Sequence, residues 1–145
     1  MKKFVFVALL SLFAVQVLPA QESVTQDIKR LPQNAQNFIA KHFADEKISY
    51  IKIDEELLKT DYDVIFVSGK EIEFTKDGEW KEVDCKHSAI PSAIIPVNIQ
   101  TYVSQNFNGI LITKIEKKSN HYEVELSNNL DLDFDRNGNF LRIDD

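Results

Sequence analysis

The sequence predicts an α+β protein built from two consecutive copies of one unit, each a helix followed by four antiparallel strands. Two observations predict this. The segment LPQNAQNFIAKHF returns later in the chain as IPVNIQTYVSQNF, so that Pro32 and Pro96 stand 64 positions apart. Further along, positions match at an offset of 60, as Tyr62 matches Tyr122, after one four-residue deletion. Because a single deletion keeps every later position in register, the pattern indicates an internal duplication.

The N-terminal residues 1–20 predict a secretory signal peptide. Lys2 and Lys3 precede a long apolar run, and Ala20 is a small residue just before the chain turns polar at Gln21. The apolar run is shorter than the ~20 residues that a membrane-spanning helix needs, so a membrane anchor is the less favoured interpretation. Cleavage after Ala20 would leave a periplasmic or secreted protein with no membrane span in its mature part.

Composition narrows the classes of partner and cofactor. The chain has 17 basic and 23 acidic residues, and loss of Lys2 and Lys3 with the signal would change its net charge from −6 to −8. Nucleic acid is therefore not an expected partner, because its binding requires a basic surface. The single cysteine, Cys85, allows no intramolecular disulfide, and burial is the expected fate, with an intermolecular bond as the alternative. No second thiol or clustered histidine accompanies it, so neither a zinc site nor a cofactor is predicted.

Each copy is predicted to begin with a helix. Pro32 and Pro96 would occupy the first helical position, where the missing N–H has no cost. Apolar residues then recur at helical spacing, which gives each helix one apolar stripe. These residues are Ala35, Phe38, Ile39 and Phe43 in the first copy and Ile99, Tyr102, Val103 and Phe107 in the second.

Four strands should follow each helix, because apolar and polar residues then alternate with a period of two. Asp77-Gly78 and Asn137-Gly138 are predicted to form the tight turns between the third and fourth strands, since these pairs tolerate positive φ. The expected strands lie near 48–54, 61–67, 70–75 and 80–84 in the first copy and near 110–116, 121–127, 130–135 and 140–144 in the second.

The alternation gives the predicted sheet one covered face and one open face. Tyr62, Val64 and Phe66 share a face, and these apolar side chains are expected to lie beneath the helix. The opposite face is strongly acidic, with a few apolar residues in the first copy, and is the predicted partner-binding surface. Its candidate residues are Tyr50, Lys52, Ile65, Val67, Glu71, Glu73, Glu123, Glu125, Asp131 and Asp133.

These observations divide the chain into a signal peptide (1–20), a first α+β unit (21–85), a linker (86–94) and a second unit (95–145). The linker reads KHSAIPSAI and is short and apolar. It is expected to pack, so that the two units dock rigidly.

Two patterns invite a chemical interpretation. The segment from Asp133 to Gly138 resembles the opening of a calcium loop, but the expected neighbours are strands and the hairpin interpretation is favoured, so no metal site is predicted. Paired carboxylates could act as acid and base, yet acid rows on a strand are typical of a solvated face. No nucleophile motif occurs and no catalytic residue is predicted, so we expect a protein that is not an enzyme. Trp80 is expected to complete the core, with a role at an interface as the alternative.

The paired helix starts LPQNAQNFI and IPVNIQTYV, the strands YDVIFV and YEVELS, the turns FTKDGEW and FDRNGNF, and the linker AIPSAIIP resemble one family. This is the PepSY-like, β-lactamase-inhibitor-protein-like family of small exported bacterial proteins. The resemblance implies one continuous antiparallel sheet backed by helices on one face. In the inhibitor that names the family, the open face grips a β-lactamase, although a shared fold does not transfer the target.

The predicted function is a non-catalytic exported binding module, an inhibitor or regulator that acts through the open acidic sheet face on a protein of the envelope or outside the cell. The alternative is a periplasmic carrier of a small ligand or cation. A hydrolase with an unrecognised site is a third hypothesis.

Overall fold

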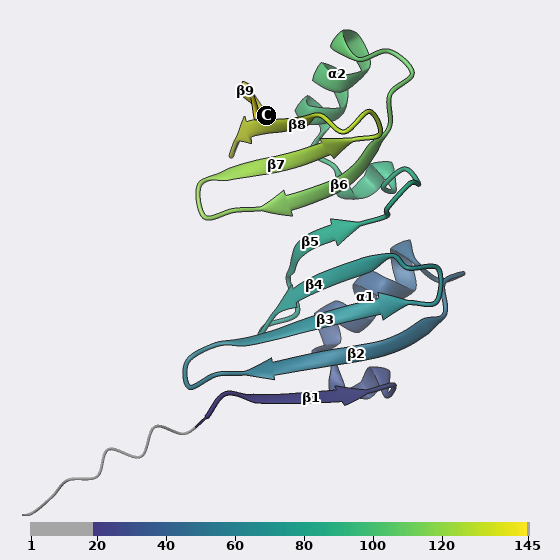
Figure 1. The fold of residues 1–145 in the computed structure, drawn as a ribbon, viewed down its shortest axis with the longest axis vertical. Helices are drawn as coiled ribbons and strands as arrows, with labels where there is room; N and C mark the ends of the chain where they lie inside the picture. Colours follow the sequence, from purple (N-terminus) through teal and green to yellow (C-terminus); the bar gives the residue numbers. More distant parts are fainter. Residues whose placement is uncertain (1–18, 145) are drawn as a thin grey trace, which may run out of the picture.

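The computed structural model describes residues 19–144. Most of the predicted signal peptide, residues 1–18, lies outside these described residues. Within this range the chain forms one nine-stranded antiparallel sheet whose strands lie side by side in chain order, with two α-helices (Figure 1). Across the described range, no helix has the length and apolar character needed to cross a membrane.

All eight predicted strands and both predicted helices are present, with boundaries that differ by about two residues or fewer from those expected. The first half contains β1 (Gln21–Thr25), a short 3-10 helix η1 (Ile28–Arg30), α1 (Gln33–His42), β2 (Ile48–Glu55), β3 (Thr60–Phe66), β4 (Glu71–Thr75) and β5 (Trp80–Asp84). The second half contains η2 (Ser92–Ile94), α2 (Val97–Asn106), β6 (Ile112–Lys117), β7 (His121–Leu126), β8 (Asp131–Asp135) and β9 (Phe140–Asp144).

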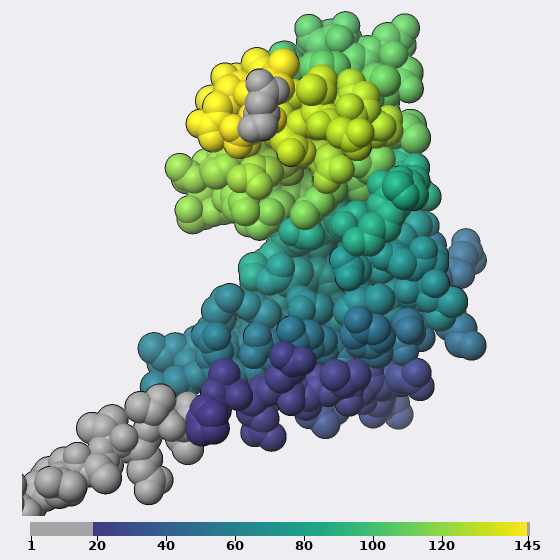
Figure 2. All heavy atoms as spheres, viewed as in Figure 1, coloured from purple at the N-terminus to yellow at the C-terminus, as the bar shows by residue number. Residues whose placement is uncertain are grey.

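The ninth strand, β1, was not predicted. Its sequence QESVT has no clear alternation, and it is a strand because it pairs with the outer edge of β2, with Ser23 opposite Ile53 and Thr25 opposite Ile51. Context of this kind decides strand formation more than propensity does. In the space-filling view, β1 (purple) and β9 (yellow) lie at opposite ends of the molecule (Figure 2).

Both helices cover the same face of the sheet. Phe38 of α1 packs edge-on against Phe74 of β4, with ring centroids 5.7 Å apart. Tyr102 of α2 packs in the same way on Phe134 of β8, at 5.5 Å. Both helices begin one residue after their prolines, which precede the helix instead of opening it as expected.

One row of buried aliphatic side chains runs beneath the helices through the middle of the sheet. Each member lies opposite the next in the strand register, and all seven are at most 1% exposed. The row consists of Ile51, Val64, Ile72, Val83, Ile115, Val124 and Leu132. Because the row crosses from β5 to β6 without a break, the two halves share one hydrophobic core.

The segment after β5 also packs against the second half. Cys85 is buried, and its N–H donates to the carbonyl of Thr113 at 2.9 Å. Ile90 is buried as well, and its N–H donates to the carbonyl of Ile112 at 2.9 Å. Within the segment 86–94, Ile90 and Ile94 are buried, whereas residues 86–89 are exposed.

The two predicted glycine turns contact the helix starts. Asn34 of α1 donates its side-chain N–H to the carbonyl of Asp77 at 3.1 Å, and Asn98 of α2 donates to that of Asn137 at 2.8 Å. Gly78 follows Asp77 with a φ of +80°, and a Cβ there would lie 2.8 Å from the backbone nitrogen of Ala35. Glycine is thus required both for the turn and for the close approach of the helix.

Candidate functional site

On the open face, meaning the sheet face opposite α1 and α2, two of the hollows contain most of the candidate residues. The first, of about 300 Å³, is lined by Tyr50, Lys52, Asp63, Ile65, Glu71, Ile72, Glu73 and Glu82. The second, of about 160 Å³, is lined by Lys114, Glu116, Glu123, Val124, Glu125, Asp131, Asp133 and Asp144. Strands β2 to β5 supply the first hollow, and strands β6 to β9 supply the second.

Nine of the ten candidate residues line these hollows. The exception is Val67, which was expected at the end of the second strand of the first copy (61–67) but lies in the turn after β3, where it is 66% exposed. The candidate list left out Asp63, which lies on β3 with Ile65. It also left out the lining residues of strands that supplied no candidate, and the charged ones among these are Glu82, Lys114, Glu116 and Asp144.

The two hollows occupy corresponding places in the two halves. Six lining positions of the first match six of the second at the sequence offsets of 64 or 60. These pairs are Tyr50 with Lys114, Lys52 with Glu116, Asp63 with Glu123, Ile65 with Glu125, Glu71 with Asp131, and Glu73 with Asp133. Their character differs, since four acids and one base line the first hollow, but six acids and one base line the second.

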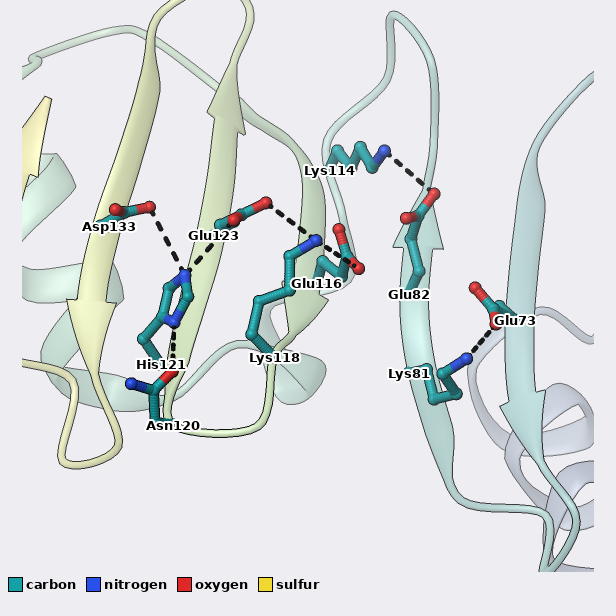
Figure 3. A network of polar contacts seen from close by, with 10 residues as sticks. All are labelled: Glu73, Lys81, Glu82, Lys114, Glu116, Lys118, Asn120, His121, Glu123 and Asp133. Atoms are coloured by element: carbon teal, nitrogen blue, oxygen red, sulfur yellow. Dashed lines mark hydrogen bonds and ion pairs between the residues drawn. The ribbon is translucent and has the colours of Figure 1, made fainter. Parts of the chain in front are cut away.

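Ion pairs cross the open face from strand to strand (Figure 3). Lys81 of β5 pairs with Glu73 of β4, and Lys114 of β6 reaches back to Glu82 of β5 at 3.0 Å. Each exposed pair adds little to the free energy of unfolding. Together these pairs hold the side chains in place and neutralise part of the acidic charge.

Two carboxyl groups of the first hollow are perturbed. Burial raises the pKa of Asp63, and the nearby carboxylate of Glu73 raises it further. Burial also raises the pKa of Glu82, and the hydrogen bond from Lys114 only partly opposes this effect. A cationic group entering the hollow would therefore gain from stabilising carboxylates that water solvates poorly.

Glu125 and Asp131 lie opposite one another on β7 and β8 in the second hollow. Among the described residues, neither has a basic side chain within 4 Å, which leaves two carboxylates free to attract a cation.

At one side of the second hollow, His121, Glu123 and Asp133 bring their possible ligand atoms within 4.8 Å of one another. The Nε2 atom of His121 lies 3.3 Å from Glu123 and 4.0 Å from Asp133, while Nδ1 lies 2.7 Å from the side-chain oxygen of Asn120 (Figure 3). With Nδ1 beside Asn120, the Nε2 atom faces the two carboxylates, so these three side chains offer one imidazole and two carboxylate ligands to a metal cation.

The same region contains the segment that resembles a calcium loop. Asp133 is almost completely buried, and Arg142 of β9 holds its carboxylate at 2.6 Å. Asp135 instead accepts hydrogen bonds from the backbone N–H groups of Asn137 and Asn139, each at 2.9 Å, which lower its pKa together with the Asn139 side chain. Asp133 thus forms an ion pair with Arg142, whereas Asp135 accepts hydrogen bonds that stabilise the β8–β9 turn.

Trp80 lies at the joint between the halves and is partly buried. Its ring is 6.4 Å from that of Phe38, which places it at the edge of the core as predicted. On its other side, the ammonium group of Lys117 from β6 lies 3.8 Å from the ring centroid. Burial lowers the pKa of Lys117, so this cation–π contact compensates for lost hydration.

This architecture is similar to that of known proteins. The family model described as "Putative beta-lactamase-inhibitor-like, PepSY-like" matches residues 60–142. A search of curated proteins found no match to the chain.

Three solved structures share the fold. A "putative periplasmic protein of unknown function" from Bacteroides vulgatus is 44% identical with a TM-score of 0.82, over 86% of this chain and 100% of that one. A "putative calcium-regulated periplasmic protein" from Bacteroides thetaiotaomicron is 43% identical with a TM-score of 0.81, over 86% and 97%. A second Bacteroides vulgatus protein is 40% identical with a TM-score of 0.81, over 86% and 97%. The chain therefore belongs to the PepSY-like, β-lactamase-inhibitor-like family, as its sequence motifs predicted.

Proposed function

We propose that this protein is a non-catalytic periplasmic binding module that captures a partner protein on its open sheet face. The observation that carries the proposal is the pair of corresponding hollows on one uncovered face, which together include nine of the ten candidate residues. Support for the compartment comes from the relatives described as periplasmic. The signal peptide remains part of this proposal, and it fits the start of β1 at Gln21, directly after the predicted cleavage point.

The charges of the two hollows define the chemistry of the partner. The second hollow carries six acidic residues against one basic residue, so it suits a segment rich in lysine or arginine. The first hollow adds Tyr50 and Ile65 to its acids and suits a mixed surface with an apolar side chain. A partner that spans both hollows would present a basic segment beside a partly apolar one.

The sharpest test reverses the two acids of the second hollow, Glu125 and Asp131, which form no ion pair within 4 Å among the described residues. We expect the double variant Glu125→Lys with Asp131→Lys to lose capture of the partner in a pull-down from envelope extracts, because the second hollow would become basic. Glu71, Glu73 and Asp133 are less suitable targets, since each is held in an ion pair whose loss would disturb the sheet.

A matched control makes the same change in charge elsewhere. Glu55→Lys with Glu56→Lys alters two exposed acids, the last residue of β2 and the first of the following turn, both outside these hollows. This control should capture the partner as the unmodified protein does. Equal capture by the Glu125/Asp131 variant would contradict the placement of the binding surface.

A divalent cation carrier is the second candidate function. Two observations favour it: the cluster of His121, Glu123 and Asp133 at the second hollow, and a relative described as "putative calcium-regulated". If a cation binds there, calorimetric titration with calcium or zinc should give heat that Glu123→Gln abolishes and Glu79→Gln, at an exposed turn, retains. Absence of heat with both metals would exclude this function and leave protein capture untouched.

We also propose that the halves are copies of one unit, 21–85 and 95–145, joined by the segment 86–94. Equivalent contacts support this. Asn34 and Asn98 bind the two glycine turns in the same way, and Gln36 and Gln100 each donate to a carbonyl five residues earlier, at 2.8 Å and 2.7 Å.

A further inference from the structure

Strand β9 ends the sheet with its outer edge unpaired within residues 19–144. Ile143 continues the buried row of the sheet, since it lies opposite Leu132, yet it is 46% exposed. An aliphatic residue on a free strand edge invites another strand to pair there. At the opposite end of the sheet the edge strand is β1, which has the polar residue Thr25 opposite Ile51 and so does not continue the aliphatic row.

Strand β5 occupies the equivalent place in the first half, but its outer edge is paired with another strand. Val83 of β5 lies opposite Ile72 of β4, as Ile143 of β9 lies opposite Leu132 of β8. On its other side β5 pairs with β6, and there Val83 meets Ile115 and becomes completely buried.

The direction of the backbone groups follows from the same comparison. Cys85 donates its N–H to Thr113 next to β6, so Val83, two residues earlier, also directs its N–H and C=O toward β6. Ile143 holds the equivalent place and therefore directs its backbone groups away from β8, toward the free edge.

We propose that a second copy of this chain pairs its β9 antiparallel with β9 of the first, about a two-fold axis at Ile143. In this register Ile143 meets its own counterpart and exchanges two backbone hydrogen bonds with it. Arg142 then lies opposite Asp144 of the partner subunit, and Asp144 lies opposite the partner subunit's Arg142. The edge is self-complementary, which an isologous dimer requires.

The side chains are available for these contacts. Arg142 and Asp144 are both more than half exposed. Arg142 already holds Asp133 and lies 3.9 Å from Asp144 within its own chain, and its guanidinium group has further N–H donors for a carboxylate of the partner subunit. The pairing of β5 with β6 has a similar pattern within one chain. Val83 lies opposite Ile115, and beside this apolar pair Asp84 lies opposite Lys114.

Disulfide trapping tests the register directly. The full chain carrying Ile143→Cys should form a covalent dimer in dilute oxidant, because equivalent residues at the axis face one another. Cys85 does not interfere, since it is buried. Leu58→Cys is the matched control, because Leu58 is more exposed, at 93%, but lies at a distant turn. Equal cross-linking of the two variants would overturn the proposal.

Sedimentation velocity of the purified full-length product provides a second test. Ile143→Pro removes an N–H that faces away from β8, so the fold should persist while the dimer is lost. Asp144→Arg should also yield monomer, because Arg142 would then face an arginine. Dimer retained by both variants, monomer already in the unmodified protein at high concentration, or open-ended polymers would each overturn the proposal.

Mixing two charge-reversed variants tests the proposed ion pairs between Arg142 and Asp144 across the dimer axis. Arg142→Asp and Asp144→Arg should each be monomeric alone, and they should form a dimer when mixed, because their edges are complementary. Circular dichroism checks the fold of Arg142→Asp, which lacks the cation that holds Asp133. Should that variant fail to fold, the outcomes for Ile143→Pro and Asp144→Arg still decide the matter.

Discussion

Val83 of β5 lies directly opposite Ile115 of β6, and neither side chain has any exposed surface. This pair joins the two halves of the molecule into one sheet and one core. The relationship has a thermodynamic consequence. Halves that share a buried row are expected to unfold together in a single transition.

Ile115→Ala tests this consequence. The substitution opens a cavity at the joint, and such changes in a core cost about 2–5 kcal/mol of unfolding free energy. We expect one urea transition, shifted to lower denaturant, with no intermediate. Leu58→Ala is the control, since Leu58 is 93% exposed in the turn between β2 and β3 and its truncation should cost much less. Two separate transitions would contradict the shared core.

Gly78→Ala should destabilise the protein more than Gly69→Ala does. Both glycines have positive φ, +80° and +90°, so both substitutions carry a backbone cost of roughly 1–2 kcal/mol. Only at Gly78 would the new Cβ meet a neighbour, 2.8 Å from the backbone nitrogen of Ala35, whereas nothing lies within 4 Å at Gly69. The difference between the two melting temperatures measures the contact between turn and helix. Equal shifts would show that the helix yields without cost.

Asp63→Asn should raise stability at neutral pH. Burial and the carboxylate of Glu73 raise the pKa of Asp63 in the folded state above its unfolded value. Its protonated form therefore favours folding, and stability is lost as pH rises from the unfolded to the folded pKa. Asparagine removes this loss, so the variant should gain stability above that window and show a flatter profile from pH 4 to 7.

Asp135→Asn should change the free energy of unfolding in the opposite direction to Asp63→Asn. Hydrogen bonds from Asn139 and Asn137 lower the pKa of Asp135, so its charged form favours folding. That contribution is present above the unfolded pKa and is lost as pH falls through the folded pKa. The variant should therefore be less stable at neutral pH. Urea titrations at several pH values measure both variants, and changes in the same direction would refute this explanation.

Cys85 should resist thiol reagents in the folded protein. It is only 2% exposed, and burial raises the pKa of its thiol to about 11, so little thiolate exists near neutral pH. A colorimetric disulfide reagent at pH 8 should react slowly with native protein and at once in denaturant. Rapid native reaction would revive the intermolecular disulfide that the sequence left open.

Most of the fold could be predicted because its signals are local. The alternation of apolar residues marked eight strands, and Asp77-Gly78 and Asn137-Gly138 marked two turns that the structure contains. Comparison of matching positions also identified the covered face, since Val64, Phe66 and Phe74 are all buried. Strand β1 was missed because its five residues carry no such signal and become a strand only through pairing with β2.

The candidate site was predicted in composition but not in shape. The period of two showed that Glu123 and Glu125 share a face, which is a property of one strand. It could not show that Lys114 lies opposite Glu125 or that Lys114 reaches Glu82, because both depend on the register between strands, including a bulge in β6 and the pairing of β5 with β6 across the two halves. Val67 was misplaced because β3 ends one residue before it.

Patterns in the amino-acid sequence were enough to predict the α+β class, the two helices, eight of the nine strands within residues 19–144, and the family to which the chain belongs. Helical and strand periodicity act within one element, so they can be recognised without knowledge of the neighbours. Three features required the folded chain: Val83 meets Ile115, the acids gather into two hollows, and the strand with Ile143 lies at a free edge. Each of these depends on which strand lies beside which, and that outcome is set by packing across the whole sheet.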